Sequence, residues 1–465
     1  MTKLPATWLV SNSTIAAKFS ATCFLTARHV SDMLWGDAPF GLIWTAWGGT
    51  RVEAWAPAAV NETCSDVVPG SPVMPGGPQA YSTLYNGMIH PLTRYSVRAA
   101  FWFQGEHNVV THSSRALYAC QFGGMINAWR DAWTGIGDFP FFWVQLAPYT
   151  GYSSGPGHGD TSIIRLAQAD SLPHIGLDTT GMAVAIDLGD PQAPAGDVHS
   201  RRKEGVAYRL ALQAMYNNFN NIILTIVLAS LVAVLYCVDY TPRSIRHTDS
   251  RTFGGLLCLN WGSRHVAYAF QEGENVTNYD HPELTPHPFP LHFSGPMISS
   301  AAYTADGQVT LTFEYAEGLF LNETAGCEIH RGTGFDGKTI GGECCKAKDT
   351  FQLCSGDPDN STWMLCTNAT IKQLGTAPAD AVVLTAPAPA GGAPPFTHVK
   401  YAYSNYPQCV LYNKYDLPAG PFLQPIESAG TAVTTIISAS ASKQMVAPAM
   451  TPPMGLNSCG NFDII

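Results

Sequence analysis

The sequence predicts an α/β protein whose first part is built on a parallel sheet. Four short apolar runs have the length and composition of buried strands: Gly41–Trp47, Ser96–Phe103, Phe139–Leu146 and Gly181–Leu188. Apolar residues at helical spacing lie around and between them: Phe19–Leu34, Ser82–Leu92, Ser114–Trp133, Ser162–Leu172 and Glu204–Tyr216. Strands that alternate with helices form βαβ units, which give a parallel sheet with helices on both faces.

A different pattern beyond His292 predicts a second, smaller β domain. Val309–Phe313 alternates and is β-branched, as a strand with one buried face does. Six of the twelve cysteines lie between Cys327 and Cys409: Cys327, Cys344, Cys345, Cys354, Cys366 and Cys409. No pair among them has the C-x-x-C spacing of a zinc ribbon, so we expect disulfides of undetermined connectivity. Cys23 and Cys120 lie inside apolar patterns and are expected to be free and buried.

Composition narrows the class of function. The 465 residues carry a net charge of −10 and include no block of basic residues, so we expect no nucleic-acid binding. The cysteines, together with six N-x-S/T sequons, favour a secreted or lysosomal/lumenal glycoprotein. The sequons begin at Asn12, Asn61, Asn275, Asn322, Asn360 and Asn368. Met1–Lys18 lacks the apolar region of a signal peptide, so we expect the natural start to be missing.

One apolar segment does not fit a soluble enzyme. Ile222–Val238 has no charged residue and is slightly shorter than the about 20 residues of a typical membrane span. A membrane span, a buried helix and sequence foreign to the domain are all compatible with it. A membrane is therefore expected as a partner, in a single-pass protein, only if this segment is a genuine span.

The residues that follow the apolar runs carry the chemistry, because ligands bind beyond the carboxyl ends of parallel strands. Gly48 and Gly49 follow the first run, and their amides suit an oxyanion, although a simple tight turn gives the same pattern. Gln104, Glu106 and Asn108 follow the second run. They suit substrate orientation, or else a capped loop that enters the next helix.

Asp197 and His199 follow the fourth run. A carboxylate two residues before an imidazole suits an oriented general base, because the carboxylate fixes the tautomer of the ring. The chain has 14 histidines, most of which must be structural or exposed, so the pair alone is a weak signal.

The order of several segments resembles that of the sialate O-acetylesterases, members of the SGNH-hydrolase group. They include FSATCFLTARHVSDML, GLIWTAWGGTRVEAW, LYNGMIHPL, WFQGEHN, GMAVAIDLGDPQAPAGDVHSRRKEGVAYRL and, near the end, YAYSNYPQCVLYNKYDLPAGPF. The resemblance covers residues 7–215 and 264–425. It implies a three-layer, flavodoxin-like SGNH domain, incomplete in this chain, with a smaller disulfide-stapled β domain.

The resemblance also implies roles for the residues at the strand ends. His199 is the expected base, and Asp197 is its orienting partner. Gln104 and the amides of Gly48 and Gly49 would build the oxyanion hole, supported by Glu106 and Asn108. A serine of the family attacks an acetyl ester on a sugar, typically sialic acid, and neither a metal nor another cofactor is expected. Ser200 stands where the family usually has proline, with little expected effect.

Three departures from the family pattern set the expected domain limits. The family's G-Q-S-N block with the nucleophilic serine has no counterpart here, so residues 1–215 are expected to be an incomplete esterase domain that is inactive alone. Residues 216–263 interrupt a stretch that is continuous in the family and read as an insertion. A β domain at 264–429 and a linker then follow. Residues 430–465 hold this linker and the end of the chain. Within them, Thr451–Phe462 resembles the opening of the family-27 α-galactosidases.

The main hypothesis is a carbohydrate O-acetylesterase that acts on acetylated sialic acid. One alternative is a non-catalytic glycan-binding relative that keeps the pocket without the serine. Another is an esterase for a different acetylated glycan, such as xylan.

Overall fold

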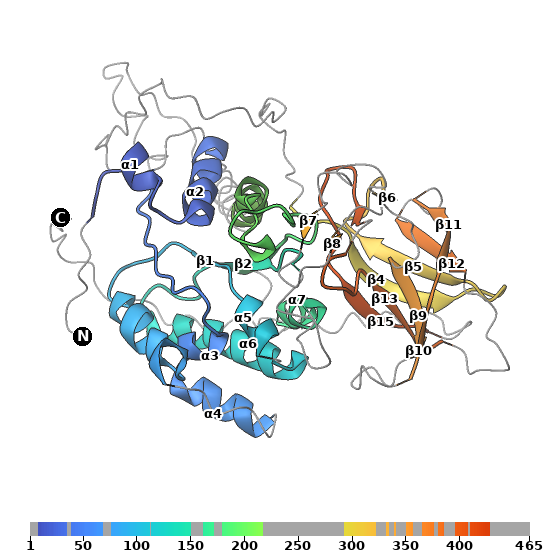
Figure 1. The fold of residues 1–465 in the computed structure, drawn as a ribbon, viewed down its shortest axis with the longest axis horizontal. Helices are drawn as coiled ribbons and strands as arrows, with labels where there is room; N and C mark the ends of the chain where they lie inside the picture. Colours follow the sequence, from blue (N-terminus) through green and yellow to red (C-terminus); the bar gives the residue numbers. More distant parts are fainter. Residues whose placement is uncertain are drawn as a thin grey trace, which may run out of the picture.

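The computed structural model describes two packed parts of the chain, one α/β and one β (Figure 1). The described residues are 8–34, 39–67, 76–111, 113–149, 161–171, 179–216, 293–321, 332–333, 339–340, 350–356, 365–375, 380–385, 396–407 and 410–427. The apolar segment at 222–238, the galactosidase-like end and Cys327, Cys344, Cys345 and Cys409 lie outside them. The predicted domain limits therefore stay predictions.

A parallel sheet of three strands forms the centre of the α/β part. Its strands are β1 (Ala100–Trp102), β2 (Phe141–Gln145) and β3 (Thr180–Val184), in the order β1-β2-β3. All five residues of β2 are buried, as expected for a central strand that is covered on both faces. The predicted strands at 96–103, 139–146 and 181–188 are confirmed; the first two are shortened at both ends, and the third begins one residue earlier and ends at Val184.

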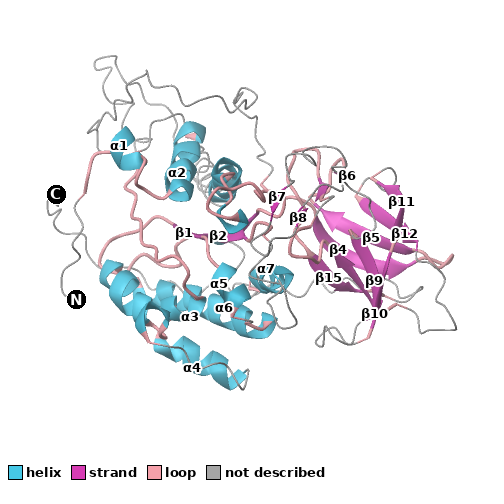
Figure 2. Ribbon diagram, viewed as in Figure 1, coloured by secondary structure: helices cyan, strands magenta, loops and turns pink. Residues whose placement is uncertain are grey.

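Helices cover both faces of this sheet, so the predicted three layers are confirmed (Figure 2). Along β2, Phe141 and Trp143 contact rings of α6 (Arg115–Ala132) on one face. Phe142 and Val144 pack with the helix over 203–216 on the other face. Successive side chains of a strand point to opposite faces, and both sets here are apolar.

The other elements of the α/β part surround this core. They are α1 (Ser13–Ala16), α2 (Ala21–Met33), α3 (Val52–Trp55), α4 (Ala58–Val67), η1 (Gly77–Gln79), η2 (Tyr85–Ile89), η3 (His90–Leu92), α5 (Glu106–Val110), α7 (Thr161–Asp170) and η5 (Asp197–His199). The predicted helices are confirmed, although the segment at 82–92 folds as a π-helical turn followed by a 3₁₀ turn.

The predicted strand Gly41–Trp47 is wrong. The segment has no ladder partner among the described residues. Trp44 and Trp47 are 53% and 54% exposed, whereas a strand buried in the sheet would cover them. The sequence has the composition of a strand, but a strand exists only where a neighbour accepts its backbone hydrogen bonds.

The β part consists of antiparallel sheets. One holds β10 (Leu365–Asn368), β9 (Phe351–Ser355), β13 (His398–Tyr401) and β15 (Phe422–Pro425), and another holds β11 (Thr370–Leu374), β12 (Ala381–Thr385), β5 (Val309–Glu314) and β4 (Met297–Tyr303). Two pairs are smaller: β14 (Leu411–Tyr412) with β6 (Phe320–Leu321), and β7 (Gly332–Thr333) with β8 (Thr339–Ile340). Buried residues of both four-stranded sheets share one core, which includes Leu311, Phe351, Val382 and Tyr401.

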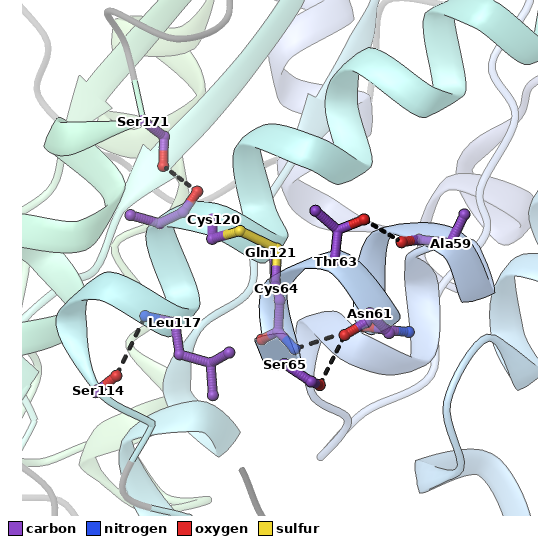
Figure 3. The surroundings of a disulfide bond; sticks show 11 residues. Ala59, Asn61, Thr63, Cys64, Ser65, Ser114, Leu117, Cys120, Gln121 and Ser171 are labelled. Atoms are coloured by element: carbon purple, nitrogen blue, oxygen red, sulfur yellow. Dashed lines mark hydrogen bonds between the residues drawn. A yellow bond between two sulfur atoms is a disulfide. The ribbon is translucent and has the colours of Figure 1, made fainter. Parts of the chain in front are cut away.

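Disulfides join elements in both parts. Cys354 of β9 bonds Cys366 of β10, so a disulfide in the β part is confirmed. Cys64 of α4 bonds Cys120 of α6, which holds the two helices side by side (Figure 3). The expectation of a free Cys120 is therefore wrong. Its helix α6 packs against α4, so Cys120 meets Cys64 there. Cys23 is free and half-buried, and burial raises the pKa of its thiol to about 11.

A largely buried ion pair of the α/β part accepts a hydrogen bond from the β part. Arg209 donates from Nη1 to Oδ1 of Asp187 at 2.6 Å and from Nη2 to Oδ2 at 2.7 Å. Tyr412 of β14 donates its hydroxyl to the same carboxylate at 2.9 Å. Burial alone would raise the pKa of Asp187, but Arg209 and Tyr412 outweigh it and hold that pKa below its ordinary value.

None of the helices described is long and apolar enough to cross a membrane.

Candidate active site

The turn after the first apolar run is held by its own threonine. Thr50 donates from Oγ1 to the carbonyl of Trp47 at 2.7 Å and accepts from Trp55 Nε1 at 3.0 Å. Gly49 has a φ of +68°, a conformation that favours glycine. Gly48 and Gly49 are exposed, so the turn presents backbone to solvent.

Gln104 links this turn to the end of β1. Its Nε2 donates to the carbonyl of Thr50 at 3.1 Å and to Oδ1 of Asn108 at 2.7 Å. Its Oε1 accepts from the hydroxyl of Tyr118 at 3.1 Å. Both amide hydrogens of Gln104 are thus engaged inside the protein, and the side chain fixes the distance between the two turns.

Asn108 and Glu53 form a buried pair behind the turn. Asn108 accepts from the backbone nitrogen of Val52 at 3.0 Å and donates from Nδ2 to Oε2 of Glu53 at 2.9 Å. Sequence reasoning missed Glu53, which is buried on α3, just beyond the two glycines. The signal for it was a charged residue between Val52 and Ala54 in an apolar stretch, since a carboxylate is buried there only with partners.

Gly105 lets the chain turn sharply into α5. Its φ is +140°, and a Cβ there would lie 3.1 Å from Cγ2 of Ile164 and 3.1 Å from Cδ1 of Leu146. The chain continues directly into Glu106, the first residue of the short helix α5. The loop does enter the next helix, but Gly105 stands at its N-cap and no side-chain hydrogen bond caps α5, so the capped-loop interpretation is wrong in this respect.

Glu106 lies at the centre of the charged groups. Its backbone carbonyl accepts from the hydroxyl of Tyr149 at 3.0 Å. Burial raises the pKa of the Glu106 carboxyl, and a hydrogen bond from its own backbone and the nearby charges of Lys203 and His199 lower it in part. The ammonium of Lys203 lies 4.8 Å from the centre of the Phe103 ring. Sequence reasoning missed Lys203 and Tyr149.

Asp197 and His199 lie on the single 3₁₀ turn of η5, after β3. The backbone nitrogen of His199 donates to the carbonyl of Gly196 at 2.9 Å, and Gly196 has a φ of +95°. Asp197 is 3% exposed, whereas His199 is exposed. The turn therefore anchors the carboxylate and presents the imidazole to solvent.

Ser200 closes the loop that carries η5. Its hydroxyl donates to the carbonyl of Leu188 at 2.7 Å and accepts from the backbone nitrogen of Arg202 at 3.2 Å. Arg201 pairs with Asp190, from Nε to Oδ2 at 2.6 Å. Ser200 therefore has a local structural use that a proline at this position could not provide.

The structure brings the strand ends to one edge of the sheet. Gln104 contacts the turn at Thr50, and Glu106 is within electrostatic range of His199. Tyr149, which follows β2, is within electrostatic range of Asp197. Parallel pairing of β1, β2 and β3 places their carboxyl ends side by side, which is why segments far apart in sequence meet here.

Within the described residues, no three side chains of His, Cys, Asp or Glu gather as a metal site.

The sequence of the α/β part is similar to known esterases. Residues 24–200 match the family described as "Carbohydrate esterase, sialic acid-specific acetylesterase". The chain is 37% identical over 206 residues to the sialate O-acetylesterase of Homo sapiens, and 34% identical over 233 residues to that of Rattus norvegicus. These matches cover 42% of this chain, and 38% and 42% of the two relatives, respectively.

The fold is similar to that of a solved bacterial protein. The crystal structure of a novel carbohydrate acetylesterase from Xanthomonas citri superposes with a TM-score of 0.55 at 21% identity. The match covers 88% of this chain and 66% of that one, so it includes both parts. The α/β architecture, the ordered motifs and the sequence match agree. Residues 24–200 are therefore similar to the carbohydrate esterase family of sialic acid-specific acetylesterases.

Proposed function

We propose that this protein is a carbohydrate O-acetylesterase that removes acetyl groups from sialic acid. The match to the sialic acid-specific family and the similarity to two mammalian sialate O-acetylesterases support the proposal. The observation that carries it is a chain of contacts at the polar strand end: Gln104 bonds the carbonyl of Thr50 beside the glycine turn, and Glu106 is near enough to His199 to be affected by its charge. The matched segment is less than half of the length of each mammalian relative. The activity of those relatives is therefore only a proposal for this chain.

In the proposed reaction, His199 takes the proton of a serine while the serine oxygen attacks the acetyl carbonyl. Asp197 orients the ring and stabilises the imidazolium. The backbone N–H groups of Gly48 and Gly49 stabilise the oxyanion. His199 then gives its proton to the departing sugar oxygen, and water attacks the acetyl-serine to release acetate and the free serine.

The serine in this scheme belongs to the family's G-Q-S-N block. No such sequence occurs among the 465 residues. The residues described here would therefore supply the base and the oxyanion donors, and the G-Q-S-N block would supply the nucleophile.

We assign Gln104 the role of holding the Gly48–Gly49 turn at its place. Its amide hydrogens are already donated to Thr50 and Asn108, and its side-chain oxygen already accepts from Tyr118. Glu53 and Asn108 extend the same support, and Glu106 is near enough to His199 to be affected by its charge.

The first test compares the 465-residue chain with a fusion. In the fusion, the part of the human relative that precedes its matched segment is placed before Phe19. We expect the fusion to release acetate from 9-O-acetylsialic acid and the chain alone to release almost none. In the fusion, His199→Ala lowers kcat by about three orders of magnitude or more, as removal of a triad base does.

His90→Ala is the matched control, because His90 is exposed and lies on η3, outside the loop of η5. Turnover of p-nitrophenyl acetate by a folded His199→Ala fusion at the unmodified rate would contradict the proposal. Preference for acetylxylan over acetylated sialic acid would favour the hypothesis of an esterase for a different acetylated glycan. Sialic acid binding without any turnover in the folded fusion would favour the glycan-binding relative.

We also propose a secreted or lysosomal/lumenal location with glycosylation at exposed sequons. Asn12 and Asn368 are exposed in the fold. Asn61 is 1% exposed, and its Nδ2 donates to the carbonyl of Glu53 at 2.9 Å, so the folded protein has no room for a glycan there.

A further inference from the structure

The loop 402–406 of the β part is fixed to the α/β part close to the candidate site. The guanidinium of Arg165 on α7 donates to the carbonyls of Ser404 at 2.8 Å and Asn405 at 3.1 Å. The same guanidinium donates from Nε to the carbonyl of Leu146, just after β2, at 2.7 Å. The backbone nitrogen of Thr161 donates to Oδ1 of Asn405 at 2.7 Å. The loop thus has a fixed position relative to the carboxyl edge of the sheet.

With the loop held in this position, Tyr406 packs against the segment that leads from β3 to η5. A Cβ at Gly189 would lie 2.3 Å from the hydroxyl oxygen of Tyr406 and 3.0 Å from Cβ of Pro148. Only glycine leaves space for the tyrosine at this point. Gly189 begins the loop that ends in Asp197 and His199, so Tyr406 touches that loop directly.

The hydroxyl of Tyr406 is buried and has no hydrogen-bond partner among the described residues. Leaving a buried hydroxyl unpartnered costs stability, and phenylalanine would fill the same space without this cost. The ring alone therefore explains the packing but not the hydroxyl.

The charges around the hydroxyl are those of the candidate site. Arg202 is near enough to affect its ionisation, and so are the carboxylates of Asp197 and Asp190. Asp190 is already engaged by Arg201, through Nε and Nη2. Among the carboxylates around Tyr406, Asp197 is the one on the same short turn as the base.

We propose that Tyr406 is a positioning residue for the esterase reaction. Its hydroxyl donates to the carboxylate of Asp197 when η5 takes the orientation in which His199 accepts the serine proton. The proposal rests on the proposed function and adds that the β part supplies a residue to the catalytic centre.

The test compares Tyr406→Phe with Tyr303→Phe in the 465-residue chain. Tyr303 donates its hydroxyl to the carbonyl of Phe396 at 3.1 Å, so its removal breaks a formed hydrogen bond. We expect Tyr303→Phe to lower Tm and Tyr406→Phe to leave Tm unchanged or higher. A clear loss of Tm in Tyr406→Phe would mean that the hydroxyl is structural and would overturn the proposal.

The second readout is the ring-nitrogen NMR signal of the labelled His199 imidazole. In the molecules in which η5 has turned, the hydroxyl donates to Asp197, so we expect Tyr406→Phe to move this signal. The groups that also face this region are Glu106, Arg202 and Asp190, and none of them is changed. In an Asp197→Asn background the movement should disappear. An unmoved signal, or an equal movement in that background, would overturn the proposal.

These two readouts need no turnover, so they separate this inference from the proposed function. In the active fusion, Tyr406→Phe should lower kcat about tenfold and leave KM nearly unchanged, because the hydroxyl acts on the base and not on the substrate. An active, His199-dependent fusion that is insensitive to Tyr406→Phe would keep the esterase and remove the role of Tyr406.

Discussion

At the scale of single residues, burial changes the ionisation of Glu106. Burial raises the pKa of its carboxyl, and Lys203 and His199 reduce this rise without cancelling it. The folded protein therefore holds the Glu106 proton to higher pH than the unfolded chain does. The contribution of Glu106 to stability is fully present below its unfolded pKa and is lost as the pH rises through its folded pKa.

Glu106→Gln should consequently be more stable than the unmodified protein at neutral pH. The difference in Tm between the two should be near zero at about pH 4 and grow toward about pH 7.5. Thermal unfolding across this range measures it. Glu62→Gln, which removes an exposed carboxylate on α4, is the control. A difference that is largest in acid would show that the sign is wrong.

At the scale of elements, sequence patterns predict the strands and helices that local composition specifies. Phe139–Leu146 predicts a strand because it is apolar throughout, and β2 is buried throughout. Gly41–Trp47 has a similar pattern but remains unpaired among the described residues, because pairing depends on a neighbouring strand and not on the segment itself. Cys120 illustrates the same limit, since its partner Cys64 is 56 residues away on another helix.

The two described disulfides should contribute unequally to stability. Their sequence separations are 56 residues for Cys64–Cys120 and 12 residues for Cys354–Cys366. Loop-closure entropy gives about 4 kcal/mol for the longer loop and about 3 kcal/mol for the shorter one. Calorimetry should therefore show the larger loss of stability in the Cys64→Ala/Cys120→Ala protein. Cys23→Ala, which breaks no disulfide, serves as control. An equal or reversed order would mean that the entropic account fails here.

At the scale of the whole molecule, the positions of the site residues follow from topology, but their contacts do not. The rule that ligands bind beyond the carboxyl ends of parallel strands is enough to predict that Gln104, Glu106, Asp197 and His199 share one edge of the sheet. Gln104 was expected to build the oxyanion hole, yet its side-chain amide already donates to the carbonyl of Thr50 and to Oδ1 of Asn108. The sequence gives no sign of the contact made by Tyr406, because this residue lies more than 200 residues from His199 and meets the loop only through packing of the β part.

The stability of the contact between the α/β part and the β part should depend on Asp187. Its lowered pKa means that its contribution to stability is present above its unfolded pKa and is lost as the pH falls through its folded pKa. Asp187→Asn leaves Arg209 buried without its carboxylate and should cost about 3–5 kcal/mol. Calorimetry should show a lower Tm for the Asp187→Asn protein. Glu317→Gln, which breaks the exposed pair with Lys414, should cost at most about 1 kcal/mol. Equal effects of the two changes would contradict this account.

The unpaired segment at 41–47 and the outer side of β1 have a practical consequence for handling the protein. In the described residues β1 pairs with β2 alone, and the rings of Phe101, Trp44 and Trp47 are exposed. Open strand backbone and exposed aromatic rings each favour contact with other molecules. Purification at high concentration therefore favours aggregates, and dilute conditions suit the measurements above.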